Sequence, residues 1–209
     1  MILRVEVGEF IPVNSYFFID DETNAGFLID PGGQADKLLE IIDEKKFVIE
    51  RILLTHGHFD HIGAANEIQA KLKIPVCMYF DGRFYVENPG WNLSASFGES
   101  LKLYDVTFYD NGTEFSLKKN PDFGVELITT PGHTTDSVIY YSKKFGVAFA
   151  GDTIFKMSYG RTDFPGGNEK TLMKSIRTKI FTLPGETILL SGHSDPTTVD
   201  AEKKFFQNI

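Results

Sequence analysis

Three histidines and one aspartate lie within six residues, in the segment His56-Gly57-His58-Phe59-Asp60-His61. Imidazole and carboxylate groups are the ligands that suit zinc, iron or manganese. Because His56 and His58 are two residues apart, both rings project from one side of an extended segment. Asp60 and His61 follow at the expected start of a helix and can reach a second, nearby point. One tetrahedral ion cannot easily use all four groups, so the segment favours two adjacent metal ions.

Three further potential ligands each follow an apolar, strand-like run and a glycine, at His133, Asp152 and His193. Loops at strand ends commonly carry the chemistry of sheet enzymes, because the sheet holds them on a rigid frame. A single histidine is more often a core residue with satisfied hydrogen bonds. All five histidines of this chain, however, stand in the 56–61 cluster or directly after glycine at a strand end. As a set they are predicted to be metal ligands.

Short β-branched runs alternate with amphipathic helical stretches, which favours a layered α/β architecture. The predicted strands are residues 2–7, 15–20, 26–29, 51–55, 75–79, 105–109, 113–117, 124–129, 137–142, 146–150 and 187–191. The predicted helices are residues 34–45, 63–73, 168–181 and 197–207. No linker rich in Ser, Gly or Pro divides the chain, so residues 1–209 are expected to form one domain. Residues 81–104 have the least pattern and are predicted to be a surface loop over the site.

The bulk composition excludes several classes of partner. The formal net charge is −8 and the sequence pI is about 5.1, so the phosphate backbone of a nucleic acid would be repelled. No apolar run approaches the ~18 residues of a membrane span, and the amino terminus lacks the apolar core of a signal peptide. The single cysteine, Cys77, is expected to be a small core residue. We therefore expect a cytoplasmic protein, as a monomer or small homo-oligomer, that acts on a small molecule.

The segment 56–61 resembles the H-x-H-x-D-H signature of the metallo-β-lactamase superfamily. Four other segments also resemble motifs of that family and occur in the family's order along almost the whole chain. They are residues 28–33, 131–134, 151–153 and 192–193. The resemblance implies a four-layer αββα sandwich that holds two divalent metal ions in a cleft along one edge. Zinc is the first expectation, with iron or manganese as alternatives.

The same resemblance implies two triads of ligands, with His56, His58 and His133 for the first metal and Asp60, His61 and His193 for the second. Asp152 would bridge the two metals. Asp30 resembles an aspartate that orients the ligand loops in this family, and a simple turn at residues 30–32 is the alternative.

The closer resemblance, carried by residues 151–155 and 160–167, is to the short glyoxalase II-like hydrolases. Glyoxalase II hydrolyses the thioester S-lactoylglutathione, so the resemblance implies a hydrolase of that compound or a related thioester. The sequence departs from that enzyme in two ways. It runs for only about 16 residues beyond His193, without a helical domain that completes the glutathione site, and Asp163 stands where a glutathione-binding tyrosine is expected. Both departures are compatible with hydrolysis of a thioester, but they leave open which thiol is released from the substrate.

In such a site two metals about 3.5–4 Å apart share a water and lower its pKa to near 7, which supplies hydroxide to attack the carbonyl. Asp60 is then both a ligand and the candidate catalytic residue that orients this nucleophile or accepts its proton. Arg161 is the candidate to bind a substrate carboxylate, and an ion pair with Asp163 is the alternative. The aromatic residues of 79–97 are candidates to line the pocket, with core packing as the alternative.

One rival activity belongs to the same fold, the mononuclear iron persulfide dioxygenase, which looks similar over residues 160–164. It would use a triad of His56, His133 and Asp152. Residues 165–167 resemble the hydrolases more. Flavo-di-iron proteins are disfavoured because they have Glu where this chain has His58, and nucleases because of the acidic charge. A catalytically silent metal-binding protein would be expected to lack a ligand, and none is missing.

Overall fold

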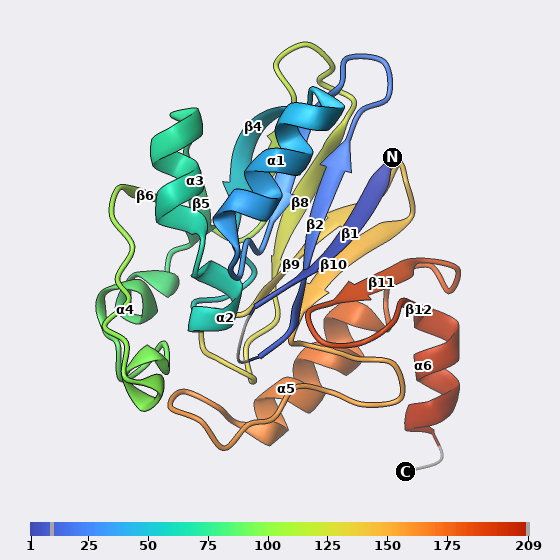
Figure 1. Cartoon of the computed structure of the whole chain (residues 1–209). Coiled ribbons are helices and arrows are strands. Elements are labelled where there is room, and N and C mark those ends of the chain that lie inside the picture. Colours follow the sequence, from blue (N-terminus) through green and yellow to red (C-terminus); the bar gives the residue numbers. More distant parts are fainter. Residues whose placement is uncertain (9–10, 208–209) are drawn as a thin grey trace.

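The computed structural model describes residues 1–8 and 11–207, and within them two six-stranded sheets pack against each other (Figure 1). In spatial order, the first sheet consists of β1 (Ile2–Val7), β2 (Val13–Ile19), β3 (Ala25–Ile29), β4 (Val48–Leu53), β5 (Val76–Tyr79) and β6 (Val106–Tyr109). The second consists of β12 (Thr197–Thr198), β11 (Ile188–Ser191), β10 (Val147–Gly151), β9 (Val138–Ser142), β8 (Gly124–Thr129) and β7 (Glu114–Ser116).

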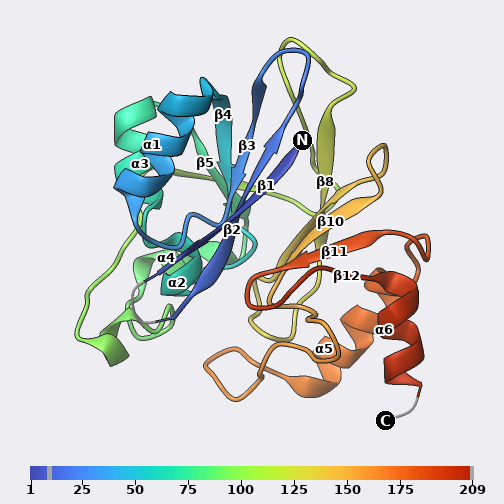
Figure 2. The same ribbon diagram turned by 45° about the vertical axis from the view of Figure 1, so that its right-hand side comes forward.

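Helices cover the outer face of each sheet, as Figure 2 shows. The first sheet is covered by α1 (Ala35–Lys45) and α3 (Ala65–Leu72), and the second by α5 (Glu169–Ser175) and α6 (Val199–Phe206). Shorter helices are α2 (Phe59–Ile62), α4 (Gly82–Glu87), the 3-10 turn η1 (Ser94–Phe97) and the π-helical turn η2 (Ile176–Ile180). The predicted four-layer αββα sandwich is therefore confirmed. In the described part of the chain, no helix has the length and apolar character needed to cross a membrane.

Apolar side chains alternate between two sides of each sheet, because successive strand residues point to opposite faces. On β2, Phe17 packs beneath the helices while Phe18 packs between the sheets. On β9, Ile139 packs beneath α5 while Tyr140 packs between the sheets. Cys77 is fully buried between the sheets, so the expectation of a core cysteine is confirmed. Strands buried on both faces explain the near-continuous apolar runs that made them predictable.

The strand directions bring five strand ends to one edge of the sandwich. In the first sheet β3 and β4 are parallel. In the second, β10 is parallel to β11, while β8 and β10 are each antiparallel to β9 and so run in the same direction. The chain segments that follow these five strands carry every predicted ligand. The fold therefore positions the site through the carboxyl ends of its strands.

The structure corrects several predicted boundaries. Strand β4 begins at Val48 rather than residue 51, because Val48 and Ile49 pair with β3 in the parallel ladder. The predicted loop 81–104 contains α4 and η1, which are too short to show a helical period. The predicted helix 168–181 changes to π-helical geometry after residue 175. The last helix starts at residue 199, because 197–198 pair with β11 and the side chain of Thr198 caps α6.

Candidate metal centre

The seven predicted ligands come together at the edge where these strands end. They are supplied by the segment after β4 (His56, His58, Asp60 and His61), by the turn after β8 (His133), and by the residues directly after β10 (Asp152) and β11 (His193). Six are buried and His193 is partly exposed. Side chains far apart in the sequence thus form one cluster of imidazoles and carboxylates.

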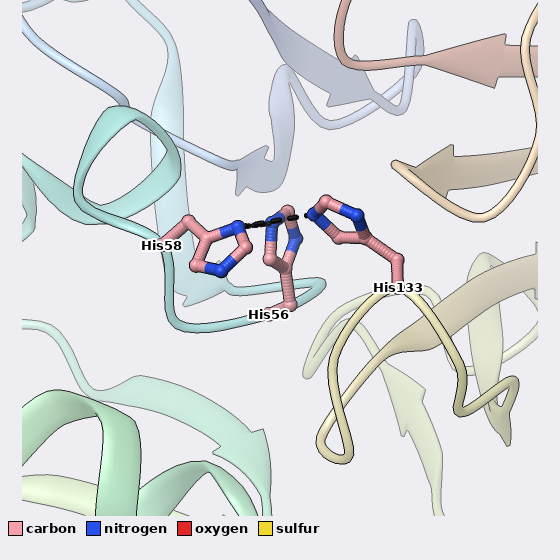
Figure 3. Close-up of side chains that lie close together, drawn as sticks. All are labelled: His56, His58 and His133. Carbon is pink, nitrogen blue, oxygen red and sulfur yellow. Dashed lines mark hydrogen bonds between the residues drawn. The ribbon is translucent and has the colours of Figure 1, made fainter. Parts of the chain in front are cut away.

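The first triad is shown in Figure 3, where His56 and His58 come from one loop and His133 approaches from the opposite sheet. Nδ1 of His58 lies 3.2 Å from Nε2 of His56 and 3.0 Å from Nε2 of His133. These three side chains can hold one metal ion, because each presents a ring nitrogen within 4.8 Å of the others.

The second triad lies beside the first and consists of Asp60, His61 and His193. Nε2 of His61 is 3.3 Å from Nε2 of His193, and Nε2 of His193 is 3.2 Å from Oδ2 of Asp60. Nε2 of His61 is 3.8 Å from Oδ2 of Asp60. Two imidazoles and one carboxylate therefore converge on a second point.

Asp152 lies between the two triads. Its Oδ1 is 3.3 Å from Nε2 of His61, and its Oδ2 is 3.6 Å from Nε2 of His133 and 3.4 Å from Nε2 of His193. One carboxylate thus faces ligands of both triads. This is the position that a bridging ligand would occupy.

Hydrogen bonds on the outer side of three rings fix their tautomers. Nδ1 of His133 donates to the backbone oxygen of Arg161 at 2.6 Å, and Nδ1 of His193 donates to that of Pro12 at 2.7 Å. Nδ1 of His61 donates to Oδ2 of Asp30 at 2.9 Å. Because carbonyl and carboxylate oxygens only accept, Nδ1 of each neutral ring carries the proton and the lone pair of Nε2 faces the cluster.

Asp30 holds the ligand loop through three hydrogen bonds. Its Oδ1 accepts from the backbone N–H of Thr55 at 2.7 Å, and its Oδ2 accepts from the hydroxyl of Thr55 at 2.6 Å as well as from His61. The hydroxyl oxygen of Thr55 lies 3.2 Å from Nδ1 of His56 and can accept its proton. Asp30 is therefore more than part of a turn, since it orients two histidines.

Glycines allow the loops to approach this closely. A Cβ on Gly192 would lie 2.5 Å from Oδ1 of Asp152 and 2.6 Å from Cε1 of His61. A Cβ on Gly57, between His56 and His58, would collide with the side chain of Tyr85. A larger residue at position 192 would displace candidate ligands directly, and one at position 57 would force the ligand loop and Tyr85 apart.

The protonation states suit cation binding. Burial, together with neighbouring His133, lowers the pKa of His58 to about 3, so the ring is neutral at physiological pH. Burial opposes ionisation of Asp152, but the surrounding histidines, His61 foremost, lower its pKa below the usual range. Burial likewise lowers the pKa of His133, so the first triad presents neutral imidazoles. Burial also opposes protonation of His61, but the carboxylates of Asp152 and Asp30 outweigh it and raise the pKa of this ring. A metal ion at the second triad therefore displaces a proton.

The donor set fits divalent metal ions. Oδ1 of Asp152 is buried without a hydrogen-bond partner among the described residues, and it lies 3.3 Å from Nε2 of His61, which carries a lone pair in the neutral ring. Acceptors held this close repel one another unless a metal ion or a proton lies between them. The spacings of 3.0–3.3 Å between ring nitrogens are close to the edge of about 3.3 Å of a tetrahedron with ~2.0–2.1 Å metal–nitrogen bonds.

A cavity of about 460 Å³ lies over the cluster. Besides five ligands, the side chains around it are Ile11, Phe59, Leu93, Phe97, Phe155, Ser158, Tyr159, Arg161 and Phe164. Of the aromatic residues predicted at 79–97, Phe97 lines the cavity, whereas Tyr85 is buried in the interior and Phe84 is half exposed outside it. Sequence reasoning missed Ile11, Leu93 and Phe155, since isolated apolar residues in separate loops form no pattern.

Arg161 lies at this cavity, but its charge is already paired. Nε and Nη2 donate to the two carboxylate oxygens of Asp163 at 2.7 and 2.6 Å, and the guanidinium stacks over the ring of Phe164, 4.1 Å from its centroid. The ion pair that the sequence left as an alternative is present. The backbone oxygen of Arg161 has a second role, since it orients His133.

Three solved structures are similar to the chain over nearly its whole length. The B3 metallo-beta-lactamase BLEG-1 matches with a TM-score of 0.91 and 34% identity, over 98% of this chain and 97% of that one. A di-iron-bound form of TTHA1623 matches with a TM-score of 0.85 and 29% identity, over 97% and 98%. ETHE1 from Myxococcus xanthus matches with a TM-score of 0.80 and 26% identity, over 98% and 82%.

Two curated relatives are similar over the same length. The probable metallo-hydrolase YqgX of Bacillus subtilis is 37% identical, over 96% of this chain and 93% of that protein. The hydroxyacylglutathione hydrolase GloC of Haemophilus influenzae is 34% identical, over 94% of both chains. The family model of the metallo-beta-lactamase superfamily matches residues 8–193. With its fold, its converging histidines and these likenesses, the chain belongs to the metallo-beta-lactamase superfamily.

Proposed function

We propose that the protein is a binuclear metal-dependent hydrolase that cleaves thioesters, in the manner of glyoxalase II. The observation that carries the proposal is the pair of ligand triads joined by one carboxylate, Asp152. The likeness to GloC supports the choice of thioesters, and the His/Asp donor set supports divalent metals.

In this proposal each metal has its own triad, His56, His58 and His133 for the first and Asp60, His61 and His193 for the second. Two bound divalent ions would supply a water of lowered pKa and a positive charge opposite the substrate carbonyl oxygen. Zinc is proposed, and the di-iron form of TTHA1623 supports iron as the alternative.

Asp60 is the proposed catalytic residue among the protein's own groups. Its carboxylate reaches both the cavity and His193, so it can orient a water in the cavity and accept its proton. A thiol leaving group has a pKa of about 8.5 and needs little help from an acid. All five histidines belong to the cluster, which leaves none to activate a serine nucleophile. Hydrolysis by an activated water is the chemistry that this arrangement supports.

A second candidate is the mononuclear iron persulfide dioxygenase, which the likeness to the ETHE1 structure favours. It would use His56, His133 and Asp152 and would give His193 no role as a ligand. The two functions therefore differ in the number of metals as well as in their products.

The test combines metal analysis with two activity assays on the purified protein. Two metals per chain and hydrolysis of S-lactoylglutathione or simpler thioesters are expected. Asp60→Asn should abolish turnover while circular dichroism shows a retained fold. Asp20→Asn is the matched control, because Asp20 pairs with Thr23 in the turn after β2, away from the cluster, and should leave turnover unchanged. One iron per chain with formation of sulfite would overturn the proposal.

A further inference from the structure

Aromatic rings surround the candidate metal centre on several sides. The ring of Phe164 meets that of His58 edge-on at 5.9 Å, and the ring of Phe155 meets that of His193 edge-on at 6.1 Å. Phe59, which follows His58 in the ligand loop, packs on Phe97 at 4.6 Å. The candidate metal centre therefore lies at the base of a cavity lined by aromatic side chains.

Two aliphatic residues also line this cavity. Ile11 precedes β2, and Leu93 precedes η1; both are partly exposed where they line the cavity. Leu93 has a φ of 71°, a left-handed conformation that a branched residue rarely adopts. Apolar surface left open in a cavity is stabilised when an apolar ligand covers it.

The cavity offers little to a charged ligand. Among the described residues that line it, Arg161 is the one lysine or arginine, and Asp163 accepts from Nε and Nη2 on one edge of its guanidinium. A glutathionyl group carries two carboxylates and one ammonium. Its two carboxylates would meet a single cationic side chain in the lining, whose charge Asp163 already balances.

From this lining we propose that the site selects its thioester by an apolar, uncharged acyl group, and that the charged ends of glutathione add no affinity. This inference rests on the proposed thioesterase function and names the substrate class of the same cavity. The lining residues that would contact the acyl group are the aromatic Phe59, Phe155 and Phe164 together with the aliphatic Ile11 and Leu93.

Binding of non-cleavable thioethers to the metal-loaded protein tests the inference. Four compounds combine a hexyl or a 2-hydroxypropyl group with glutathione or with uncharged N-acetylcysteamine. Isothermal titration should show that the hexyl compounds bind at least about tenfold more tightly than the hydroxypropyl compounds, a factor that two buried methylenes supply. Replacing N-acetylcysteamine by glutathione should change Kd less than about threefold. Tenfold tighter binding through glutathione, or equal binding of the hexyl and hydroxypropyl compounds, would overturn the inference.

The same protein preparation separates this inference from the proposed function. Hexanoyl and lactoyl thioesters of both thiols are offered to the metal-loaded enzyme. If the hexyl thioethers bind as expected and no thioester is cleaved, the thioesterase proposal fails while the preference for an apolar ligand stands. If thioesters are cleaved but the glutathione compounds bind at least tenfold more tightly than the N-acetylcysteamine compounds, the thioesterase proposal stands and the inference about the apolar acyl group fails.

A pair of variants locates the binding surface. Leu93→Asn replaces an apolar wall residue by one that tolerates a left-handed φ, and it should weaken binding of the hexyl compounds by about fivefold or more. Met157→Asn is the matched control, since Met157 also has a left-handed φ, of 58°, is 60% exposed and does not line the cavity. Ile11→Asn serves if Leu93→Asn does not fold. Unchanged binding in the folded wall variant would contradict the inference.

Discussion

Asp30 accepts a 2.9 Å hydrogen bond from Nδ1 of His61, and the same carboxylate accepts both the N–H and the hydroxyl of Thr55. One side chain, at the end of β3, therefore sets the orientation of a loop that follows β4. The other ring nitrogen of His61, Nε2, lies 3.3 Å from Oδ1 of Asp152. The geometry of the centre depends on this contact as much as on the ligands themselves.

Asp30→Asn is expected to weaken metal binding by about 10- to 100-fold, because an amide cannot accept all three hydrogen bonds. Competition with a chromophoric chelator measures the affinity. Asp20→Asn is the control, since it changes another buried aspartate and should leave metal affinity unchanged. Equal affinity in wild type and Asp30→Asn would show that Asp30 does not position His61.

Gly192→Ala is expected to lower metal affinity by about tenfold or more, since its Cβ would lie 2.5 Å from Oδ1 of Asp152. The same chelator competition applies. Gly90→Ala is the matched control, because the nearest atom to its Cβ is the side-chain oxygen of Asn88 at 3.4 Å. If Gly192→Ala bound metal as tightly as Gly90→Ala, the close approach would not constrain the site.

Asp136 is a fully buried carboxyl behind the ligand loop, beside Gly57. Burial raises its pKa to about 7. A folded pKa above the unfolded value favours the fold at low pH, and this contribution is lost as pH rises from about 4 through about 7. Because asparagine does not ionise, Asp136→Asn should abolish this loss of folding stability. The loss is about 4 kcal/mol for a pKa shift of roughly three units.

Denaturant unfolding with excess chelator, at several pH values, measures this effect. The stability of Asp136→Asn relative to wild type should be smallest near pH 4, rise up to about pH 7 and then level off. A difference that does not vary with pH would mean that Asp136 is not protonated in the fold.

Removal of the metals is expected to lower the melting temperature. The ligands converge only in the fold, so binding at a thousandfold excess over Kd stabilises by about 4 kcal/mol. For a chain of this size that corresponds to roughly 10 °C. Calorimetry before and after chelation measures the change, and zinc should restore the original value. Magnesium is the control, because it prefers oxygen ligands and should not. An unchanged melting temperature would argue against tightly bound metals.

The sequence predicts the strand ends and the convergence of the candidate ligands well, because both depend on local signals. Apolar runs mark β4, β8, β10 and β11, and histidine or aspartate follows each one. The parallel strand directions then bring these residues to one edge. Cys77 was also predictable as a core residue from its apolar neighbours.

Features that depend on long-range packing could not be predicted. The cavity wall combines Ile11, Leu93 and Phe155 from three loops, and no periodicity connects them. Helix α4 has only six residues and buries Tyr85 and Val86, too few positions for a helical pattern. The substrate class therefore had to be inferred from the assembled cavity.

The most direct test of the account is the number and position of the metal ions in crystals of the metal-loaded protein. Anomalous diffraction at the absorption edge should show two peaks, one among His56, His58 and His133 and one among Asp60, His61 and His193, with Asp152 between them. A single peak at full occupancy, with His193 not coordinated, would contradict a binuclear hydrolase.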